Sequence, residues 1–265
     1  MKLLQTEKIT RAYGGVMAVN EVDFSAQEGL ITGLIGPNGA GKTTLFNNMT
    51  GLDIPSSGKV YFKGNDITGF PSHKIARLGI ARTFQNIRLF KKMSVIENIM
   101  IGRHFMTGEG PNKARFSNML KSYFFMKNEE DIMLENAYKW LDFFDMSEFA
   151  NEDAKNLPYG RQRELEIARA LASQPKILFL DEPAAGMNPQ ETEHLMDTIR
   201  KIRDKGITVV LIEHDMKLVM SICDNITVLN YGQKIAQGTP RDIKKNPLVI
   251  EAYLGKEEED GVIKY

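Results

Sequence analysis

The residues best suited to chemistry form a glycine-rich loop followed by a lysine and two threonines. The run GPNGAGKTT matches the pattern G-x-x-x-x-G-K-[ST] in full. Glycines let the backbone approach an anion closely, so that loop and helix amides face phosphate groups while the lysine adds a point charge. The pattern predicts a nucleotide-phosphate site made of Gly36, Pro37, Asn38, Gly39, Ala40, Gly41, Lys42, Thr43 and Thr44. The hydroxyl of Thr43 is the expected ligand of Mg²⁺.

A second candidate site is a pair of acids that follows an apolar run. In ILFLDEP, four hydrophobic residues precede Asp181 and Glu182. Such a run predicts a buried strand, and ligands of open α/β sheets bind where strands end. We expect Asp181 to hold Mg²⁺ opposite Thr43 and Glu182 to polarise the attacking water. The alternative is that both acids only cap the helix that begins within PAAGMNPQETE.

Two further polar residues follow strand-like runs. His214 comes after VVLIE and is expected to reach the γ-phosphate from the same sheet edge. Gln85 comes after ARTF, and its amide is expected to reach a metal ion or a water molecule. Spacing alone leaves both residues equally compatible with ordinary polar surface.

Alternating strands and helices must position these candidates. Short β-rich runs with glycine-rich turns occupy residues 1–85, and helix and strand alternate again from residue 164, which predicts a mostly parallel α/β sheet. Between them, Ala137, Trp140 and Phe144 recur at helical spacing among other aromatic residues and methionines, which predicts amphipathic helices. The predicted organisation is therefore a core of residues 1–85 and 164–240, a helical insert of residues 86–163, and a C-terminal helix with an acidic tail over residues 241–265.

Composition excludes several classes of protein. The 265 residues carry 34 basic and 34 acidic side chains and are 42% hydrophobic, which argues against disorder and against general attraction to nucleic acid. The single cysteine, Cys223, excludes an intramolecular disulfide framework and a multi-cysteine zinc site. The N-terminus lacks the apolar core of a signal peptide, and no apolar run approaches the ~20 residues that span a bilayer. Composition thus predicts an intracellular chain without a membrane span.

The order of the motifs resembles that of the ATP-binding subunits of ABC transporters. In this resemblance Tyr13 of RAYGG stacks on adenine, Gln85 is the Q-loop glutamine and a metal ligand, ILFLDEP is the Walker B strand, and His214 is the switch histidine. The stretch LPYGRQRELEIARAL resembles the signature LSGGQ-x-R and its helix. The resemblance covers residues 3–254. It implies a P-loop NTPase (RecA-like) core with an antiparallel β region and a helical subdomain, and ATP with Mg²⁺ as ligands.

The resemblance also implies partners, because the family assembles head to tail. A second ATP-binding subunit, a related chain or another copy, would receive the signature residues Pro158, Tyr159, Gly160 and Arg161 over its nucleotide. The helical insert would dock on membrane permease subunits near Gln85, with residues 86–99 as the best candidates. The expected location is therefore peripheral, on the cytoplasmic face of the inner membrane, and no nucleic-acid partner is expected.

Two motifs depart from the family pattern, the signature and the segment that contains Asn188. Pro158 replaces the signature serine, which removes a hydroxyl and a backbone N–H, and Tyr159 replaces the next glycine. Asn188 stands where the family usually has aspartate, and Arg161 replaces a glutamine and offers a charge to the phosphate. The chain's own half-site is complete, so in a heterodimer we expect the site on this loop to hydrolyse ATP faster than its companion.

Finer features resemble one branch of the family, the LivG-type subunit of high-affinity branched-chain amino acid importers. These features are LDEPAAGMNP, LIEHDMKLVM, GTPRDIKKNPLVIEAYLG and the aromatic-rich stretch of residues 105–127. The implied function is an ATPase that powers import through ATP-driven dimerisation. The alternative is the ATPase of another ABC transporter, for urea, other amino acids or lipopolysaccharide. A soluble ABC protein of translation or DNA repair and a small-molecule kinase fit less well, since a kinase would not need LPYGRQRELEIARAL.

Overall fold

The centre of the molecule is a six-stranded sheet that is parallel except at one edge. The structure, a computed structural model, describes residues 1–104 and 119–254. In sheet order the strands are β11 (Gln233–Gly238), β10 (Asn225–Asn230), β4 (Ile31–Ile35), β9 (Thr208–Ile212), β8 (Ile177–Asp181) and β7 (Ile80–Arg82). Only β11 runs antiparallel to its neighbour. The predicted mostly parallel core is therefore confirmed.

Strands β4, β8 and β9 are buried at every position, because both faces of the sheet are covered. Along β9, Val209 and Leu211 pack in the core on one face, whereas Val210 and Ile212 pack in the core on the other. The apolar runs that predicted buried strands at ILFLD and TVVLI are thus explained by this two-sided packing.

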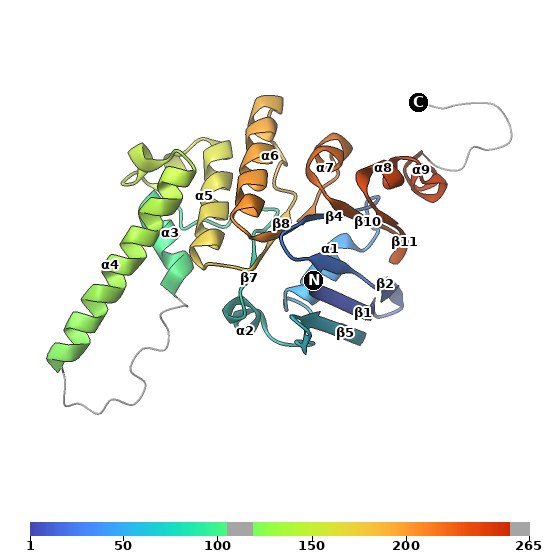
Figure 1. Ribbon diagram of the computed structural model, residues 1–265, viewed down its shortest axis with the longest axis horizontal. Coiled ribbons are helices and arrows are strands. Elements are labelled where there is room, and N and C mark those ends of the chain that lie inside the picture. Colours follow the sequence, from blue (N-terminus) through green and yellow to red (C-terminus); the bar gives the residue numbers. More distant parts are fainter. Residues whose placement is uncertain (105–118, 255–265) are drawn as a thin grey trace.

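One face is covered by helix α1 (Lys42–Met49) and a second, antiparallel sheet (Figure 1). The strands of this sheet are β2 (Val16–Val22), β1 (Lys2–Tyr13), β5 (Ser57–Phe62) and β6 (Asn65–Asp66), with β3 (Ser25–Gln27) also paired to β1. Phe46 of α1 meets Phe179 of β8 edge to face, with ring centroids 4.8 Å apart. This contact fixes the helix against the central sheet.

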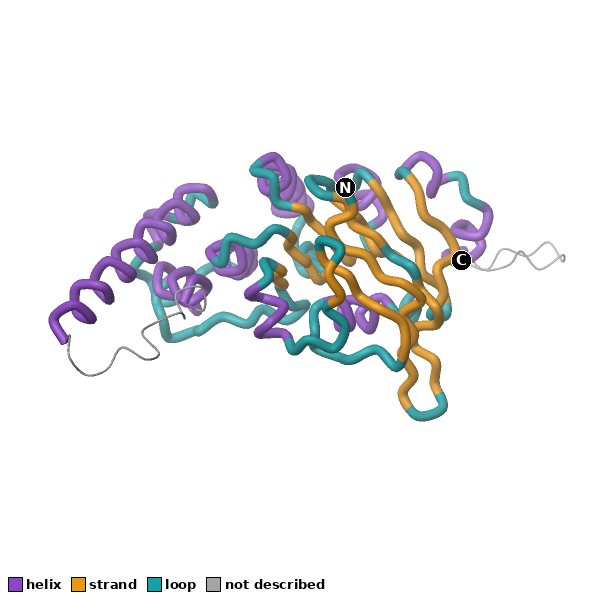
Figure 2. The backbone as a smooth tube through the Cα atoms, turned by 60° about the horizontal axis from the view of Figure 1, so that its bottom comes forward, coloured by secondary structure: helices purple, strands orange, loops and turns teal. Residues whose placement is uncertain are grey.

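Helices cover the other face and extend the molecule on one side (Figures 1 and 2). They are α5 (Tyr159–Ala172), α6 (Pro189–Asp204), α7 (Met216–Ile222), α8 (Pro240–Lys244) and α9 (Pro247–Leu254). Helix α2 (Ser72–Arg77) lies beside β7, and its Ile75 belongs to the core on the first face. The extension consists of α3 (Val95–His104), α4 (Met119–Phe143) and two short 3₁₀ turns, Ser147–Phe149 and Ala154–Asn156.

The helical spacing of the middle region is confirmed, since Ala137 and Phe144 are buried. The domain limits stay a prediction, and the one between residues 163 and 164 falls inside α5. Much of the aromatic-rich insert and the acidic tail lie in residues 105–118 and 255–265, outside the described residues.

Cys223, which ends α7, is expected to be chemically inert in the folded protein. It is 7% exposed, its sulfur packs close to Gly33 of β4, and burial raises the pKa of its thiol. Because the thiolate is the reactive form, a disulfide reagent such as DTNB should react slowly. We expect the labelled fraction of native protein to be roughly a tenth or less of that in denaturant over the same time. Rapid titration of the native thiol would contradict this packing.

Candidate nucleotide-binding site

The residues singled out from the sequence meet at one edge of the central sheet. Strands β4, β9, β8 and β7 are neighbours and parallel, so their carboxyl ends lie side by side. The glycine-rich loop follows β4, the pair of acids ends β8, His214 follows β9, and Gln85 follows β7. Such an edge is where open α/β sheets bind ligands.

The glycine-rich loop has a backbone that needs glycine at two close approaches. At Gly36 a side-chain Cβ would lie 2.1 Å from the carbonyl oxygen of Leu229, and at Gly41 it would lie 2.3 Å from that of Ala18. Gly41 is also left-handed, with φ +94°, and begins α1 without any side-chain cap. The first amides of α1 are therefore available to an anion.

Lys42 lies inside this loop. Its ammonium donates to the carbonyl oxygens of Gly36 and Pro37, at 2.7 and 2.9 Å. Burial lowers the pKa of Lys42, and the charge of Glu182 opposes that shift. The loop thus holds one cation, near the carboxylate of Glu182 and next to the free amides of α1.

Glu182 contacts the two other polar residues expected at this edge, Gln85 and His214. Its Oε2 accepts a hydrogen bond from Nε2 of Gln85 at 2.6 Å, and its Oε1 lies 3.7 Å from Nδ1 of His214. Its side chain is 21% exposed, and that of His214 is 60% exposed. The backbone of Glu182 is left-handed, with φ +46°, a conformation that is uncommon for non-glycine residues.

The oxygen donors at this edge suit Mg²⁺. Asp181 is 5% exposed at the end of β8, and its Oδ2 binds Arg82 at 2.7 Å, which leaves Oδ1. Gln85 binds Glu182 through its nitrogen, which leaves its amide oxygen, and the Thr43 residue is exposed. In the described part of the chain, no three His, Cys, Asp or Glu residues form a metal cluster. Mg²⁺ in nucleotide sites is usually bound by only a few protein oxygens, and phosphate oxygens of the substrate complete its coordination.

Sequence reasoning missed Arg82 and Glu213. Arg82 donates to Asn47 of α1 and to Thr50, the C-cap of that helix, at 2.7 and 2.9 Å, as well as to Asp181, and so joins α1 to β8. Buried Glu213 accepts from the amides of Ala184 and His214, and burial raises its pKa. It ties the segment after Glu182 to the segment that carries His214.

Sequence reasoning also missed a buried ion pair under the Q-loop segment. Arg163 is fully buried and donates to the carbonyl oxygens of Phe84 and Gln85, at 2.6 and 2.7 Å. It also pairs with Glu166 at 2.8 Å, and the other oxygen of Glu166 accepts from the amide of Arg88. The one available signal was the i, i+3 spacing of these opposite charges within the apolar helix pattern of RELEIARAL.

The signature residues lie at the start of α5. Pro158 is the N-cap, Tyr159 is exposed, and Gly160 lies beside Glu191 of α6. Arg161 is engaged with Glu164 and with the carbonyl of Phe144, both at 2.8 Å, rather than free. Within residues 1–104 and 119–254, no hydrogen bond or ion pair joins residues 158–161 to the loop of residues 36–44.

Asn188 caps α6 in a capping box with Glu191: its side chain accepts from the amide of Glu191, whose carboxylate accepts from the amide of Asn188. Asparagine and aspartate cap helices about equally well, so the neutral residue keeps this helix start intact.

Tyr13 stands at the turn between β1 and β2, 45% exposed. The same hairpin reaches the loop, because the carbonyl oxygen of Ala18 in β2 abuts Gly41. The aromatic ring is therefore on the element that flanks the loop.

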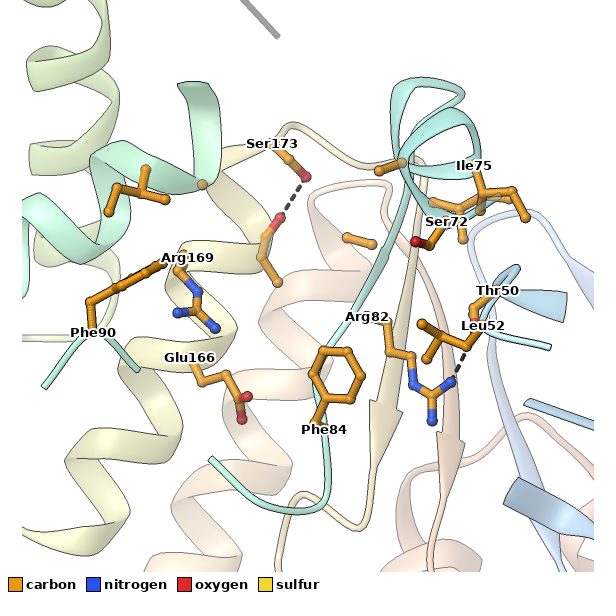
Figure 3. A pocket seen from close by; sticks show the side chains of 16 residues that line it. Thr50, Leu52, Ser72, Ile75, Arg82, Phe84, Phe90, Glu166, Arg169 and Ser173 are labelled. Atoms are coloured by element: carbon orange, nitrogen blue, oxygen red, sulfur yellow. Dashed lines mark hydrogen bonds between the residues drawn. The ribbon is translucent and has the colours of Figure 1, made fainter. Parts of the chain in front are cut away.

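A groove of about 260 Å³ opens beside the Q-loop segment (Figure 3). Leu52 and Ile75 line it from the core side, Phe90 from the segment after Gln85, and Glu166 and Arg169 from α5. The groove therefore combines apolar side chains with a buried acid, Glu166, and a partly buried base, Arg169. Burial raises the pKa of Glu166 and lowers that of Arg169.

Comparisons with known proteins give consistent matches. Residues 19–185 match the family model described as "ABC transporter", and residues 233–259 match "Branched-chain amino acid ATP-binding cassette transporter". The high-affinity branched-chain amino acid transport ATP-binding protein BraF of Pseudomonas aeruginosa is 48% identical, and LivG of Escherichia coli K12 is 46% identical. Both alignments cover 96% of this chain and 98% of the relative.

A solved structure of an ATP-binding cassette of an ABC transporter, in its ADP conformation, superposes with a TM-score of 0.83. It is 35% identical, and the match covers 97% of this chain and all of the other. Across the described residues, no helix is both long enough and apolar enough to cross a bilayer.

Proposed function

Since the chain belongs to the ABC transporter family of ATP-binding proteins, we propose that it is the ATPase subunit of an importer for branched-chain amino acids. The observation that carries the ATPase part is the contact of Glu182 with Gln85 and His214 beside Lys42. The solute rests on the names of relatives that are 46–48% identical and on the C-terminal match of residues 233–259.

The loop of residues 36–44 binds the phosphates of ATP. Lys42 leaves the carbonyls of Gly36 and Pro37 to contact the β- and γ-phosphates, and the uncapped amides of α1 face the same oxygens. Tyr13 stacks on the adenine, a contact worth about 1–3 kcal/mol.

Glu182 acts on the attacking water and His214 contacts the γ-phosphate. The Glu182 carboxylate is partly exposed and held by Gln85, so it is oriented and still reachable by water. Thr43, Asp181 and Gln85 would hold Mg²⁺, which would supply positive charge to stabilise the transferring phosphoryl group.

A second ATP-binding subunit completes the site. In the described part of the chain, no hydrogen bond or ion pair joins residues 158–161 to the chain's own loop of residues 36–44. Pro158 and Tyr159 are exposed at the start of α5. They lie over the partner's nucleotide. Proline and tyrosine in place of serine and glycine make that companion site the slower one.

The groove beside the Q-loop segment receives a helix of the membrane permease, which holds the chain at the inner membrane. An amphipathic helix fits a groove lined by Leu52, Ile75 and Phe90 with charged residues at one wall. Arg82 also lines the groove and donates to Asp181. A helix bound in the groove would therefore contact a residue that is bonded directly to the expected metal ligand.

Affinity purification from native membranes tests this assembly. The tagged wild-type chain is expected to bring down two kinds of partner, membrane permeases and a related ATP-binding subunit. Phe90→Glu puts a charge on a groove side chain that is 49% exposed, and we expect it to lower permease recovery roughly tenfold or more. Leu248→Glu, on exposed α9 outside the groove, is the control and should leave recovery unchanged. Equal recovery for both variants would contradict groove docking.

The solute is tested by uptake into vesicles that contain the purified complex and its binding protein. ATP-driven uptake of radiolabelled leucine, isoleucine and valine, without uptake of urea, supports the branched-chain amino acid assignment. Uptake of urea alone would identify another transporter of the same family, without affecting the ATPase assignment.

A further inference from the structure

Three side chains form one connected cluster at the nucleotide-base end of the site. Arg11 and Tyr13 are two residues apart on β1, where an irregularity in the pairing with β2 lies between them, and their side chains are in contact. Asp53 lies in the loop after α1. The Asp53 carboxylate accepts two bonds from Arg11, at 2.7 and 2.8 Å, and one from the phenol of Tyr13. Its side chain is only 18% exposed.

The same arginine covers one face of the tyrosine ring. The guanidinium carbon of Arg11 lies 4.5 Å from the ring centroid, a cation–π distance. Among the described residues, no other charged or aromatic side chain stacks on this ring. The residue is nonetheless 45% exposed, so the ring remains accessible to a flat ligand.

Asp53 also connects this cluster to the phosphate-binding helix. The amides of Leu52 and Asp53 donate to the carbonyl oxygen of Asn47 in α1, at 3.0 and 3.3 Å. Asn47 lies five positions beyond Lys42 on the same short helix. The ring is therefore fixed by its phenol and by one face to a loop that is itself bonded to α1.

We propose that Arg11 and Asp53 are positioning residues that clamp Tyr13 at a set place relative to the phosphate loop, so that adenine stacks on an already ordered ring. This deepens the proposed function, since it rests on ATP as the ligand and on Tyr13 as its base contact. An aromatic side chain that is ordered before binding loses little conformational entropy when the base arrives. Burial opposes ionisation of Asp53, but the hydrogen bonds from Tyr13 and Arg11 hold the pKa of its carboxyl below the usual value. The negative charge of Asp53 therefore balances the positive charge of Arg11 beside the base.

Comparison of ADP with inorganic tripolyphosphate tests the proposal, because only ADP carries a base. Dissociation constants are measured for both, with Mg²⁺, on the full chain. Arg11→Gln and Asp53→Ala are expected to weaken ADP by about 3- to 10-fold, the cost of ordering one free side chain, and to leave tripolyphosphate within about twofold. Tyr13→Ala should weaken ADP by roughly 5- to 150-fold.

Two further variants sharpen the reading. Tyr13→Phe keeps the ring and loses its bond to Asp53, so adding Asp53→Ala to it should cost less than Asp53→Ala alone. Lys59→Gln is the matched control, because it breaks an exposed ion pair with Asp66 on the same antiparallel sheet and should change neither affinity.

The outcomes separate the clamp from the base site. If Tyr13→Ala weakens ADP but Arg11→Gln and Asp53→Ala do not, Tyr13 stacks without a clamp and the proposal is overturned. Equal losses of ADP and tripolyphosphate would show a distorted phosphate loop and would overturn it as well. If Tyr13→Ala itself leaves ADP unchanged, the base contact of the proposed function fails, and the clamp fails with it.

Discussion

Glu182→Gln is expected to reduce ATP hydrolysis by about 10²- to 10⁴-fold while the affinity for ATP stays within about twofold of the wild type. Glutamine has nearly the same shape, so packing beside Gln85 and His214 is kept. The amide of glutamine cannot accept a proton from the attacking water, so general-base catalysis at this position is lost. Phosphate release and ATP binding, measured on the assembled transporter, separate the two effects.

Assembly decides how this result is interpreted. In a heterodimer we expect the site built on this chain's loop to be the faster one, so Glu182→Gln should remove most steady-state hydrolysis. In a homodimer both sites carry the substitution and activity should disappear. Glu193→Gln, exposed on α6, is the control and should leave hydrolysis unchanged. Unchanged hydrolysis by Glu182→Gln would contradict the proposed role of the Glu182 carboxylate in activating water.

Arg163→Met is expected to lower the free energy of unfolding by about 3–5 kcal/mol, a large share of the ~5–15 kcal/mol typical of a folded chain. The substitution leaves Glu166 buried without its cation and leaves the carbonyls of Phe84 and Gln85 without a donor. Urea unfolding followed by circular dichroism measures the loss. Lys139→Met, which breaks an exposed pair with Glu135, should cost no more than about 0.5 kcal/mol.

A double variant separates stability from catalysis. Replacing both members of a buried ion pair by apolar residues is often close to neutral, so Arg163→Met with Glu166→Met should recover much of the lost stability. Hydrolysis should be lower than in the wild type in both the single and the double variant, because the carbonyls of Phe84 and Gln85 lack their donor in each. A single Arg163→Met variant as stable as the wild type would refute the role of the pair.

Residues that act through the local chain were predictable from the sequence. The loop of residues 36–44 and the acids after ILFL follow apolar strands directly, and those strands are where the runs predict them. Parallel neighbours then bring Gln85 and His214 to the same edge, which spacing alone had left open. The helical pattern around Ala137 and Phe144 also reappears as buried positions.

Residues that act across the fold were not predictable. Arg82 binds Asp181 across 99 positions, and Arg163 binds the carbonyl of Gln85 across 78. Their partners are backbone oxygens or single carboxylates far away along the chain, and such partners produce no recognisable pattern of residues in the sequence. Arg161 is a different case: its position predicts a contact with the partner's phosphate, and in this chain alone it is bonded to Glu164 and to the carbonyl of Phe144. Its role at a partner's nucleotide stays a prediction.

The sealed thiol of Cys223 makes the wild-type chain a convenient background for site-specific fluorescent labelling. With its one native cysteine shielded against β4, a thiol-reactive dye attaches only where a new cysteine is introduced. Leu52→Cys, at a groove side chain that is 47% exposed, would place an environment-sensitive probe where a permease helix is proposed to bind. Docking and release could then be followed in real time during single cycles of transport, without first removing any native residue.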